Sequence, residues 1–81
     1  MNLKEKELIL RDCLIEARRG VGLTQEGLAE KLGKPQSFIS KYESGERKLE
    51  ILELFEIVSS LDQDIIKFIR ELVRRFSVGD K

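Results

Sequence analysis

The apolar residues of this chain recur every three or four positions, which is the spacing of helices with one buried face. The first such stretch covers about residues 4–19 and has apolar positions at Leu10, Leu14, Ala17 and Val21. Gly20 and Gly22 follow it, and glycine adopts the left-handed conformation that closes many helices. No segment shows the strict alternation of a strand. The pattern therefore predicts an all-α fold.

Two short helices are expected next. Thr24 is a suitable N-cap for the second helix, because its hydroxyl can accept a hydrogen bond from a free amide, and Gly33 ends that helix after roughly two turns. The third helix is expected to begin near Pro35 and to end at Ser44 and Gly45. The apolar positions of this pair are Leu28, Ala29, Leu32, Phe38, Ile39 and Tyr42. Helices this short need the rest of the protein to bury their apolar faces.

The fourth helix is predicted at about residues 49–60. Its candidates for burial are Leu52, Leu54, Ile57, Val58 and Leu61. The fifth is predicted at about residues 62–76, with Asp62 as its N-cap, and residues 77–81 are expected to fray. With no linker or repeat in the chain, the expected fold is a five-helix bundle forming a single domain over residues 1–81.

The fifth helix carries more apolar surface than one buried face requires, which suggests that it also contacts a second copy of the chain. The predicted dimer interface consists of Ile65, Ile66, Ile69, Leu72, Val73 and Phe76. The alternative is that this helix belongs wholly to the core of one copy.

The charges balance overall but are distributed unevenly. The chain has 15 basic and 15 acidic residues, which argues against a non-specific nucleic-acid coat, since such proteins are strongly basic. Residues 34–48 nevertheless carry four basic and two acidic side chains, whereas residues 49–64 carry five acids and no base. One segment can approach phosphate, and its neighbour would be repelled by it.

The residues that usually carry enzyme chemistry are scarce. Cys13 is the only cysteine and there is no histidine, so neither an internal disulfide nor a metal site is expected. No nucleophile–base pair or phosphate loop is present, which argues against an enzyme, a cofactor or a small-molecule ligand. No apolar run approaches the roughly 20 residues that span a bilayer, and the start lacks a secretion signal. A cytoplasmic protein without membrane contact is expected.

Two segments carry a recognisable motif. Residues 23–33 contain Leu-Thr-Gln, Leu-Ala and the turn residue Gly33, and residues 35–48 contain Ile-Ser-Lys-Tyr-Glu-Ser-Gly. Together they resemble the helix-turn-helix of the Cro/phage-repressor (Xre-like) family, over about residues 14–61. The whole architecture resembles small stand-alone regulators, including the controller proteins of restriction-modification systems. The resemblance implies a lambda-repressor-like DNA-binding domain in which helices two and three form the helix-turn-helix.

The resemblance also implies roles for individual residues. The third helix would lie in the DNA major groove. Its base-reading residues would be Gln36, Ser37, Ser40 and Lys41. Glutamine can bind adenine with two hydrogen bonds, and lysine can bind the acceptors of guanine. Gln36 and Lys41 are therefore the strongest candidates for base reading.

Phosphate contacts are implied on both sides of these residues. The expected phosphate-binding residues are Thr24, Gln25, Phe38, Ser44, Arg47 and Lys48, with a role in the core equally open for Phe38. Arg18 and Glu43 would form a structural ion pair.

The resulting hypothesis is a transcriptional regulator that binds a palindromic operator in double-stranded DNA as a homodimer. The alternative is an antitoxin or another protein-interaction module on the same scaffold.

Overall fold

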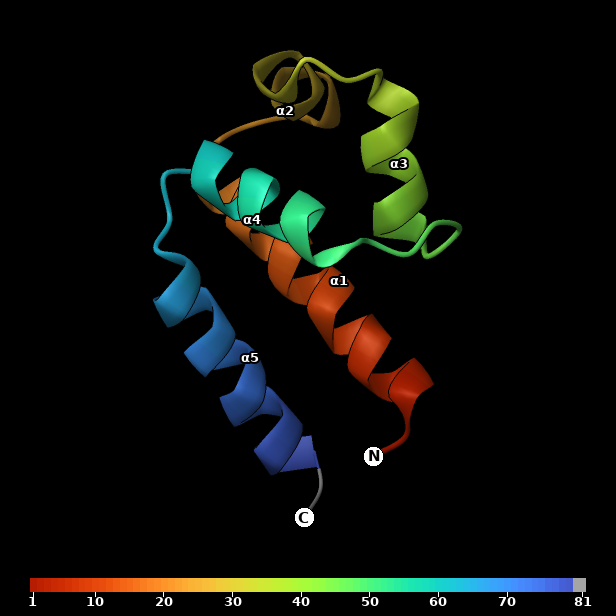
Figure 1. Ribbon diagram of the computed structural model, residues 1–81, viewed down its shortest axis with the longest axis vertical. Coiled ribbons are helices and arrows are strands. Elements are labelled where there is room, and N and C mark those ends of the chain that lie inside the picture. The colour runs from red at the N-terminus through yellow and green to blue at the C-terminus, as the bar shows by residue number, and fades with distance from the viewer. Residues whose placement is uncertain (80–81) are drawn as a thin grey trace.

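The computed structural model describes residues 1–79. These residues form five α-helices and, within that range, no strand (Figure 1). The helices are α1 (Leu3–Gly20), α2 (Gln25–Leu32), α3 (Gln36–Ser44), α4 (Ile51–Ser60) and α5 (Ile65–Gly79). The predicted all-α architecture is therefore confirmed, with the helix-turn-helix formed by α2 and α3.

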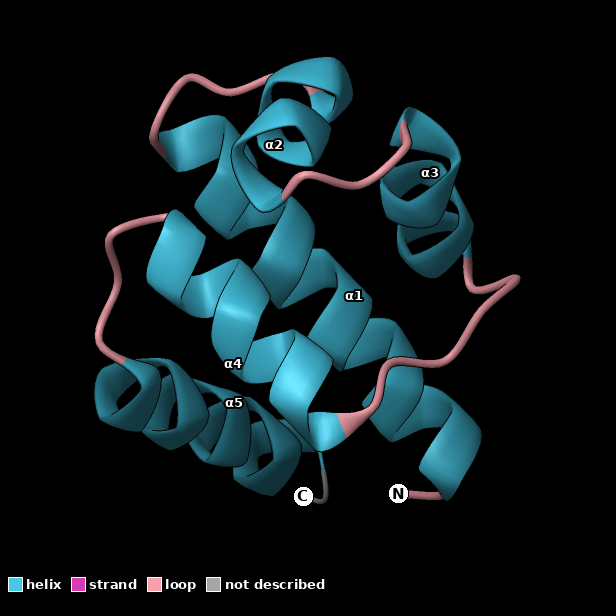
Figure 2. Ribbon diagram, turned by 45° about the horizontal axis from the view of Figure 1, so that its top comes forward, coloured by secondary structure: helices cyan, strands magenta, loops and turns pink. Residues whose placement is uncertain are grey.

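Helix α1 is the longest helix and packs against two of the others. It contacts both α3 and α5, which lie on different sides of it, while α2 contacts α3 and α4 (Figures 1 and 2). Leu14 of α1, Leu28 of α2, Ile39 of α3 and Ile57 of α4 are each at most 1% exposed. The short α2–α3 pair thus buries its apolar side against the longer helices. This agrees with the expectation that helices this short cannot bury their apolar faces alone.

The ends of α2 follow the expected chemistry. The Thr24 hydroxyl oxygen accepts a hydrogen bond from the Gly27 N–H at 3.0 Å, so Thr24 is the N-cap. Gly33 closes the helix with a φ of 67°, a conformation that side chains with a Cβ rarely adopt. The turn between the two helices is therefore set by residues that the sequence singled out.

The boundary between α4 and α5 differs from the prediction. Asp64 rather than Asp62 caps α5, with its Oδ1 accepting from the Ile66 N–H at 2.7 Å. Asp62 belongs to the turn that ends α4: its φ is 57° and its N–H donates to the Ser59 carbonyl at 3.0 Å. The predicted N-cap was wrong because an aspartate can close one helix or open the next, and Asp62 and Asp64 lie only two positions apart.

Two further helix boundaries differ from the prediction. Helix α4 begins at Ile51 instead of residue 49, because Glu50 and Glu53 form a capping box in front of it. Helix α5 continues to Gly79, so the fraying predicted from residue 77 is wrong up to that point. Residues 80–81 of that prediction lie outside the described residues. The described helices include none that is long and apolar enough to cross a bilayer.

The predicted burial is right for most of α4 and wrong at single positions. Leu54, Ile57, Val58 and Leu61 are at most 7% exposed, but Leu52 is 70% exposed. Leu52 lies two positions from Leu54, which places it on the opposite side of the helix. Val21, expected to continue the apolar face of α1, is also half exposed, because it lies in the turn after that helix.

Candidate nucleic-acid interface

Helix α3 separates a buried side from an exposed one. Ile39 and Tyr42 point into the core and are at most 1% exposed. Gln36, Ser37 and Lys41 are exposed. Ser40, the fourth predicted base-reading residue, is half buried, and its hydroxyl donates to the Ser37 carbonyl at 3.2 Å. The structure thus leaves three of the four predicted side chains open to a partner and the fourth partly occupied within its own helix.

A chain of polar side chains joins the core to the start of α3. Arg18 of α1 donates to both carboxylate oxygens of Glu43, at 2.8 and 3.0 Å, so the two residues expected to form an ion pair do so. The third guanidinium nitrogen of Arg18 donates a hydrogen bond to the Leu23 carbonyl at 2.8 Å. The hydrogen bond to Glu43 raises the pKa of Arg18, against the opposing effect of burial. The pair fixes α1 against α3.

Two glutamines extend this series of hydrogen-bonded side chains to the surface. The Gln25 amide donates to Glu43 Oε1 at 3.0 Å, and the Gln36 amide donates to Gln25 Oε1 at 3.5 Å. A phosphate candidate from α2 and a base-reading candidate from α3 therefore lie side by side. They lie close to the start of α2, where free backbone amides and the helix dipole favour an anion.

The basic residues after α3 already have acidic partners. The Arg47 guanidinium donates to both carboxylate oxygens of Glu53, at 2.9 and 2.8 Å, and Lys48 lies 3.3 Å from Glu7. Arg47 and the backbone N–H of Glu50 lower the pKa of Glu53 to about 2. The positive charge that the sequence places after α3 is thus partly neutralised by acids brought in from α1 and α4.

Ser44 lies on the same exposed corner of the molecule as these basic residues. Its hydroxyl donates to the Lys41 carbonyl at 3.1 Å and accepts from the Glu46 N–H at 3.4 Å. Its position keeps it available to a nearby phosphate, although its hydroxyl has local partners.

Phe38 lies at the border between the core and the basic surface. Its ring meets Tyr42 edge to face, with centroids 5.6 Å apart. Two cations lie over the same ring, Lys34 Nζ at 5.2 Å and the Arg47 guanidinium carbon at 4.9 Å from its centroid. Phe38 is half buried, so it both packs against the core and holds two basic side chains in place. Sequence reasoning missed the contact of Lys34 with Phe38, and helical spacing could not have indicated it, because Lys34 precedes α3.

Chemistry other than recognition finds little support in the described residues. Within residues 1–79 no group of histidine, cysteine, aspartate and glutamate side chains is arranged to hold a metal ion. Cys13 is buried, and burial raises the pKa of its thiol, which disfavours the reactive thiolate.

Two short helices packed against each other, with the polar side of the second exposed, form the arrangement of a helix-turn-helix. A family model described as helix-turn-helix matches residues 14–68, more than half of the chain. A solved structure of an XRE-family-like protein from Pseudomonas syringae pv. tomato str. DC3000 superposes with a TM-score of 0.84 at 36% identity, covering 89% of this chain and 88% of that one. This chain belongs to the XRE family of helix-turn-helix DNA-binding transcription regulators.

A second solved structure extends the comparison. The wild-type restriction-modification controller protein C.Esp1396I superposes with a TM-score of 0.82 at 25% identity, covering 94% of this chain and 97% of that one. The likeness therefore includes α5 and not the helix-turn-helix alone. A sequence comparison with curated proteins finds no match.

Proposed function

We propose that this protein regulates transcription by binding a palindromic operator as a homodimer, with α3 of each copy in the major groove. The observation that carries the proposal is the exposed side of α3, where Gln36, Ser37 and Lys41 are open to solvent and Gln36 contacts Gln25 at the start of α2. The opposite side of α3 is fully buried, so the exposed side chains are presented on a fixed backbone. Pre-positioned polar groups lose less freedom on binding.

Two groups of residues divide the work of recognition in this proposal. Gln36 and Lys41 read base edges, with Ser37 and Ser40 contacting the same bases or the adjoining sugar. Phosphates are held on one side by the start of α2, with Thr24 and Gln25, and on the other side by the corner after α3. That corner consists of Phe38, Ser44, Arg47 and Lys48.

The apolar surface outside the core supports a second copy as the partner. On α5, Ile66 is 57% and Val73 is 51% exposed, and they share one stripe with the half-buried Ile69. Ile65 and Phe76 are also half buried and border the core. Leu72, which the sequence also assigned to the interface, is 8% exposed and packs in the core of one copy.

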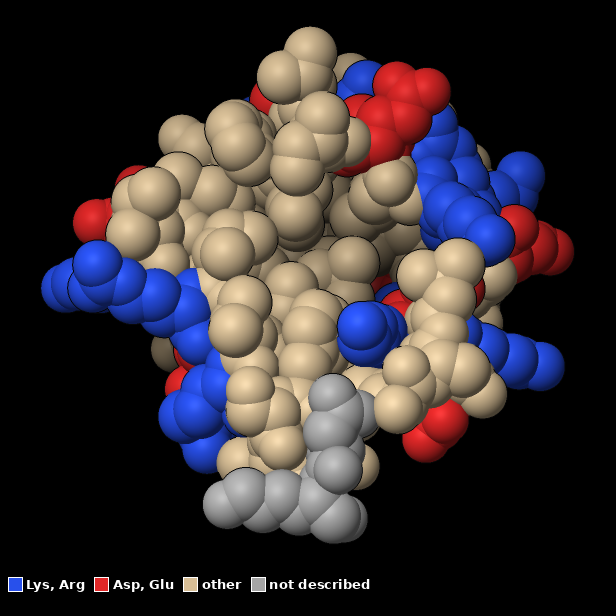
Figure 3. All heavy atoms as spheres, turned by 60° about the horizontal axis from the view of Figure 1, so that its bottom comes forward, with Lys and Arg blue, Asp and Glu red and all other residues tan. Residues whose placement is uncertain are grey.

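Helix α4 adds exposed apolar side chains that sequence reasoning placed in the core or did not single out. Ile51 is 62%, Leu52 is 70% and Phe55 is 44% exposed, and α4 packs against α5. Figure 3, seen from the side of the two chain ends, shows a broad uncharged area with most charged side chains at its edges. This surface supports an interface formed by α4 and α5 together. In such a dimer two copies of α3 would reach half-sites about 34 Å apart.

The experiment that tests the proposal is selection of bound DNA from a random double-stranded pool by the purified protein. We expect two inverted half-sites whose centres lie about 10 base pairs apart. A pool that returns no motif at low salt would contradict sequence-specific binding. A motif with a single half-site would contradict the homodimer while leaving DNA recognition intact.

The exposed apolar residues of α4 also favour a second candidate, an antitoxin-like module that binds another protein through this face. Sedimentation of the purified protein separates the two. A protein that stays monomeric at all concentrations leaves the face open for a different partner, whereas a concentration-dependent dimer covers it.

A further inference from the structure

Arg11 of α1 lies directly against the turn that ends α3. A Cβ atom added to Gly45 would collide with the Arg11 guanidinium, so this guanidinium lies directly against Gly45. Gly45 also has a φ of 85°, which favours glycine independently. The fold therefore brings a basic side chain from α1 to the corner that carries Ser44, Arg47 and Lys48.

Arg11 has no acidic partner in the part of the chain that the structure describes. Among residues 1–79, neither an ion pair nor a hydrogen bond joins Arg11 to an acid, whereas Arg47 is held by Glu53 and Lys48 by Glu7. Lys4, seven positions earlier on the same face of α1, likewise has no acidic partner in that range. At the end of α3 an unpaired cation thus stands beside two paired ones.

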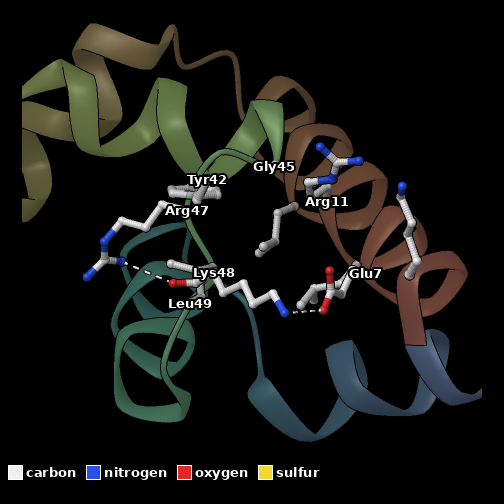
Figure 4. A pocket seen from close by; sticks show the side chains of 10 residues that line it. Glu7, Arg11, Tyr42, Gly45, Arg47, Lys48 and Leu49 are labelled. Atoms are coloured by element: carbon white, nitrogen blue, oxygen red, sulfur yellow. Dashed lines mark hydrogen bonds and ion pairs between the residues drawn. The ribbon is translucent and has the colours of Figure 1, made fainter.

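A cavity of about 240 Å³ lies between α1 and the segment that follows α3, and Arg11, Gly45 and Lys48 are among its lining residues. Leu10, Leu14 and Leu49 line its apolar side, and Lys48 reaches across it toward Glu7, while Arg11 lies on the Gly45 side (Figure 4). Arg11 and Lys48 therefore both line this cavity. The Lys48 side chain is 77% exposed, so its pairing with Glu7 is screened by water and easily exchanged.

We propose that Arg11 binds a phosphate of the DNA backbone, with the phosphodiester lying between Arg11 and Lys48 at the end of α3. The proposal rests on the DNA binding proposed above and adds a contact from α1 to it. A guanidinium suits this position because its planar set of donors can bind two phosphate oxygens at once. Lys48 exchanges Glu7 for the phosphate when DNA arrives.

The test is the salt dependence of binding to the selected operator, measured for wild type, Arg11→Gln and Arg11→Lys. Each phosphate contact contributes about 0.9 to the slope of log K against log salt concentration, so Arg11→Gln is expected to lower the slope by about 0.9 per half-site. The lysine variant retains the charge and should keep the slope. Base preference in the selection should not change.

Lys67→Gln on α5 is the matched control, because it removes one exposed positive charge far from α3 and should leave the slope unchanged. Thermal melting by circular dichroism shows whether each variant is folded. If Arg11→Gln does not fold, Arg11→Met, which keeps the aliphatic part of the side chain over Gly45, replaces it. A folded neutral variant with the wild-type slope would overturn the proposal. Absence of specific binding by the wild type would instead contradict the proposed function.

Discussion

Arg18 and Glu43, 25 residues apart in the chain, meet in a two-point contact in which their side chains are only 8% and 5% exposed. One lies near the end of α1 and the other near the end of α3. The pair therefore determines how the exposed helix is held on the rest of the molecule, and the same carboxylate also holds Gln25.

Removing one partner should destabilise the protein strongly. Arg18→Met is expected to lower the free energy of unfolding by about 3–5 kcal/mol, because it leaves the Glu43 carboxylate buried without a cation. Urea denaturation followed by circular dichroism measures this change. The control is the double variant Arg18→Met with Glu43→Leu, which should recover much of the loss since no buried charge remains. A single variant within 1 kcal/mol of wild type would contradict the assigned role.

Acid should weaken the fold through Glu53. Its pKa is lowered from 4.5 to about 2 in the folded protein, chiefly by Arg47. The stabilisation is therefore complete above about pH 4.5 and is lost as the pH falls toward 2. We expect the melting temperature of Glu53→Gln to fall less over this interval than that of wild type. Glu71, whose pKa is also about 2, keeps part of the acid dependence in both proteins.

The matched control for this measurement is Glu56→Gln. Glu56 is exposed and lies on the same helix, and it forms no ion pair within residues 1–79. Its variant should follow the wild-type pH profile. Identical profiles for Glu53→Gln and wild type would show that the Arg47–Glu53 contact does not stabilise the fold.

The residues on α3 should affect which sequence is bound. Gln36→Ala and Lys41→Ala are each expected to cost about 1–3 kcal/mol of discrimination at one position of each half-site, because a base contact is lost. Repeating the DNA selection with each variant measures the relaxed position. An unchanged selected motif for both variants would show that other residues read the bases.

The residues after α3 should affect how tightly any sequence is bound. Arg47→Gln and Lys48→Gln are expected to weaken binding to specific and non-specific DNA by similar factors and to reduce the salt dependence. Affinity titrations on both kinds of DNA at several salt concentrations measure this. A loss restricted to the operator would instead indicate base reading by these side chains.

The apolar surface of α5 should control assembly. Val73→Glu is expected to yield a monomer at concentrations where wild type sediments as a dimer, because a charge would enter an apolar interface. The control is Val21→Glu, which places the same charge on a half-exposed valine in the α1–α2 turn. Loss of the dimer in both variants would mean that the effect is not specific to the α5 face.

Helix positions follow from the sequence where one local signal dominates. The apolar spacing of α2 and α3, the Thr24 cap and the glycine at 33 each point to the same structure, and the structure agrees. At Asp62 and Asp64 two equivalent caps compete, so the choice depends on where α4 stops. Leu52 is apolar, as a core residue would be, but it lies on the exposed side of α4 and not in the core.

The candidate interface was only partly predictable for a related reason. The exposed residues of α3 follow from the motif, because they are neighbours in the sequence. The acids that pair with Arg47 and Lys48, and the approach of Arg11 to Gly45, join residues from different helices. A count of charges along one segment cannot include them, since only the packing of α1 and α4 brings them to this corner.

Phe38 has a consequence for how this sequence can change over time. Its ring supports Lys34, which precedes α3, and Arg47, which follows it, so one side chain orders both connections of the helix. Loss of the aromatic ring would release both cations together, and loss of either cation would reduce the benefit of keeping the ring. We therefore expect positions 34, 38 and 47 to covary among related sequences, with basic residues at the outer two wherever an aromatic residue occupies the middle one.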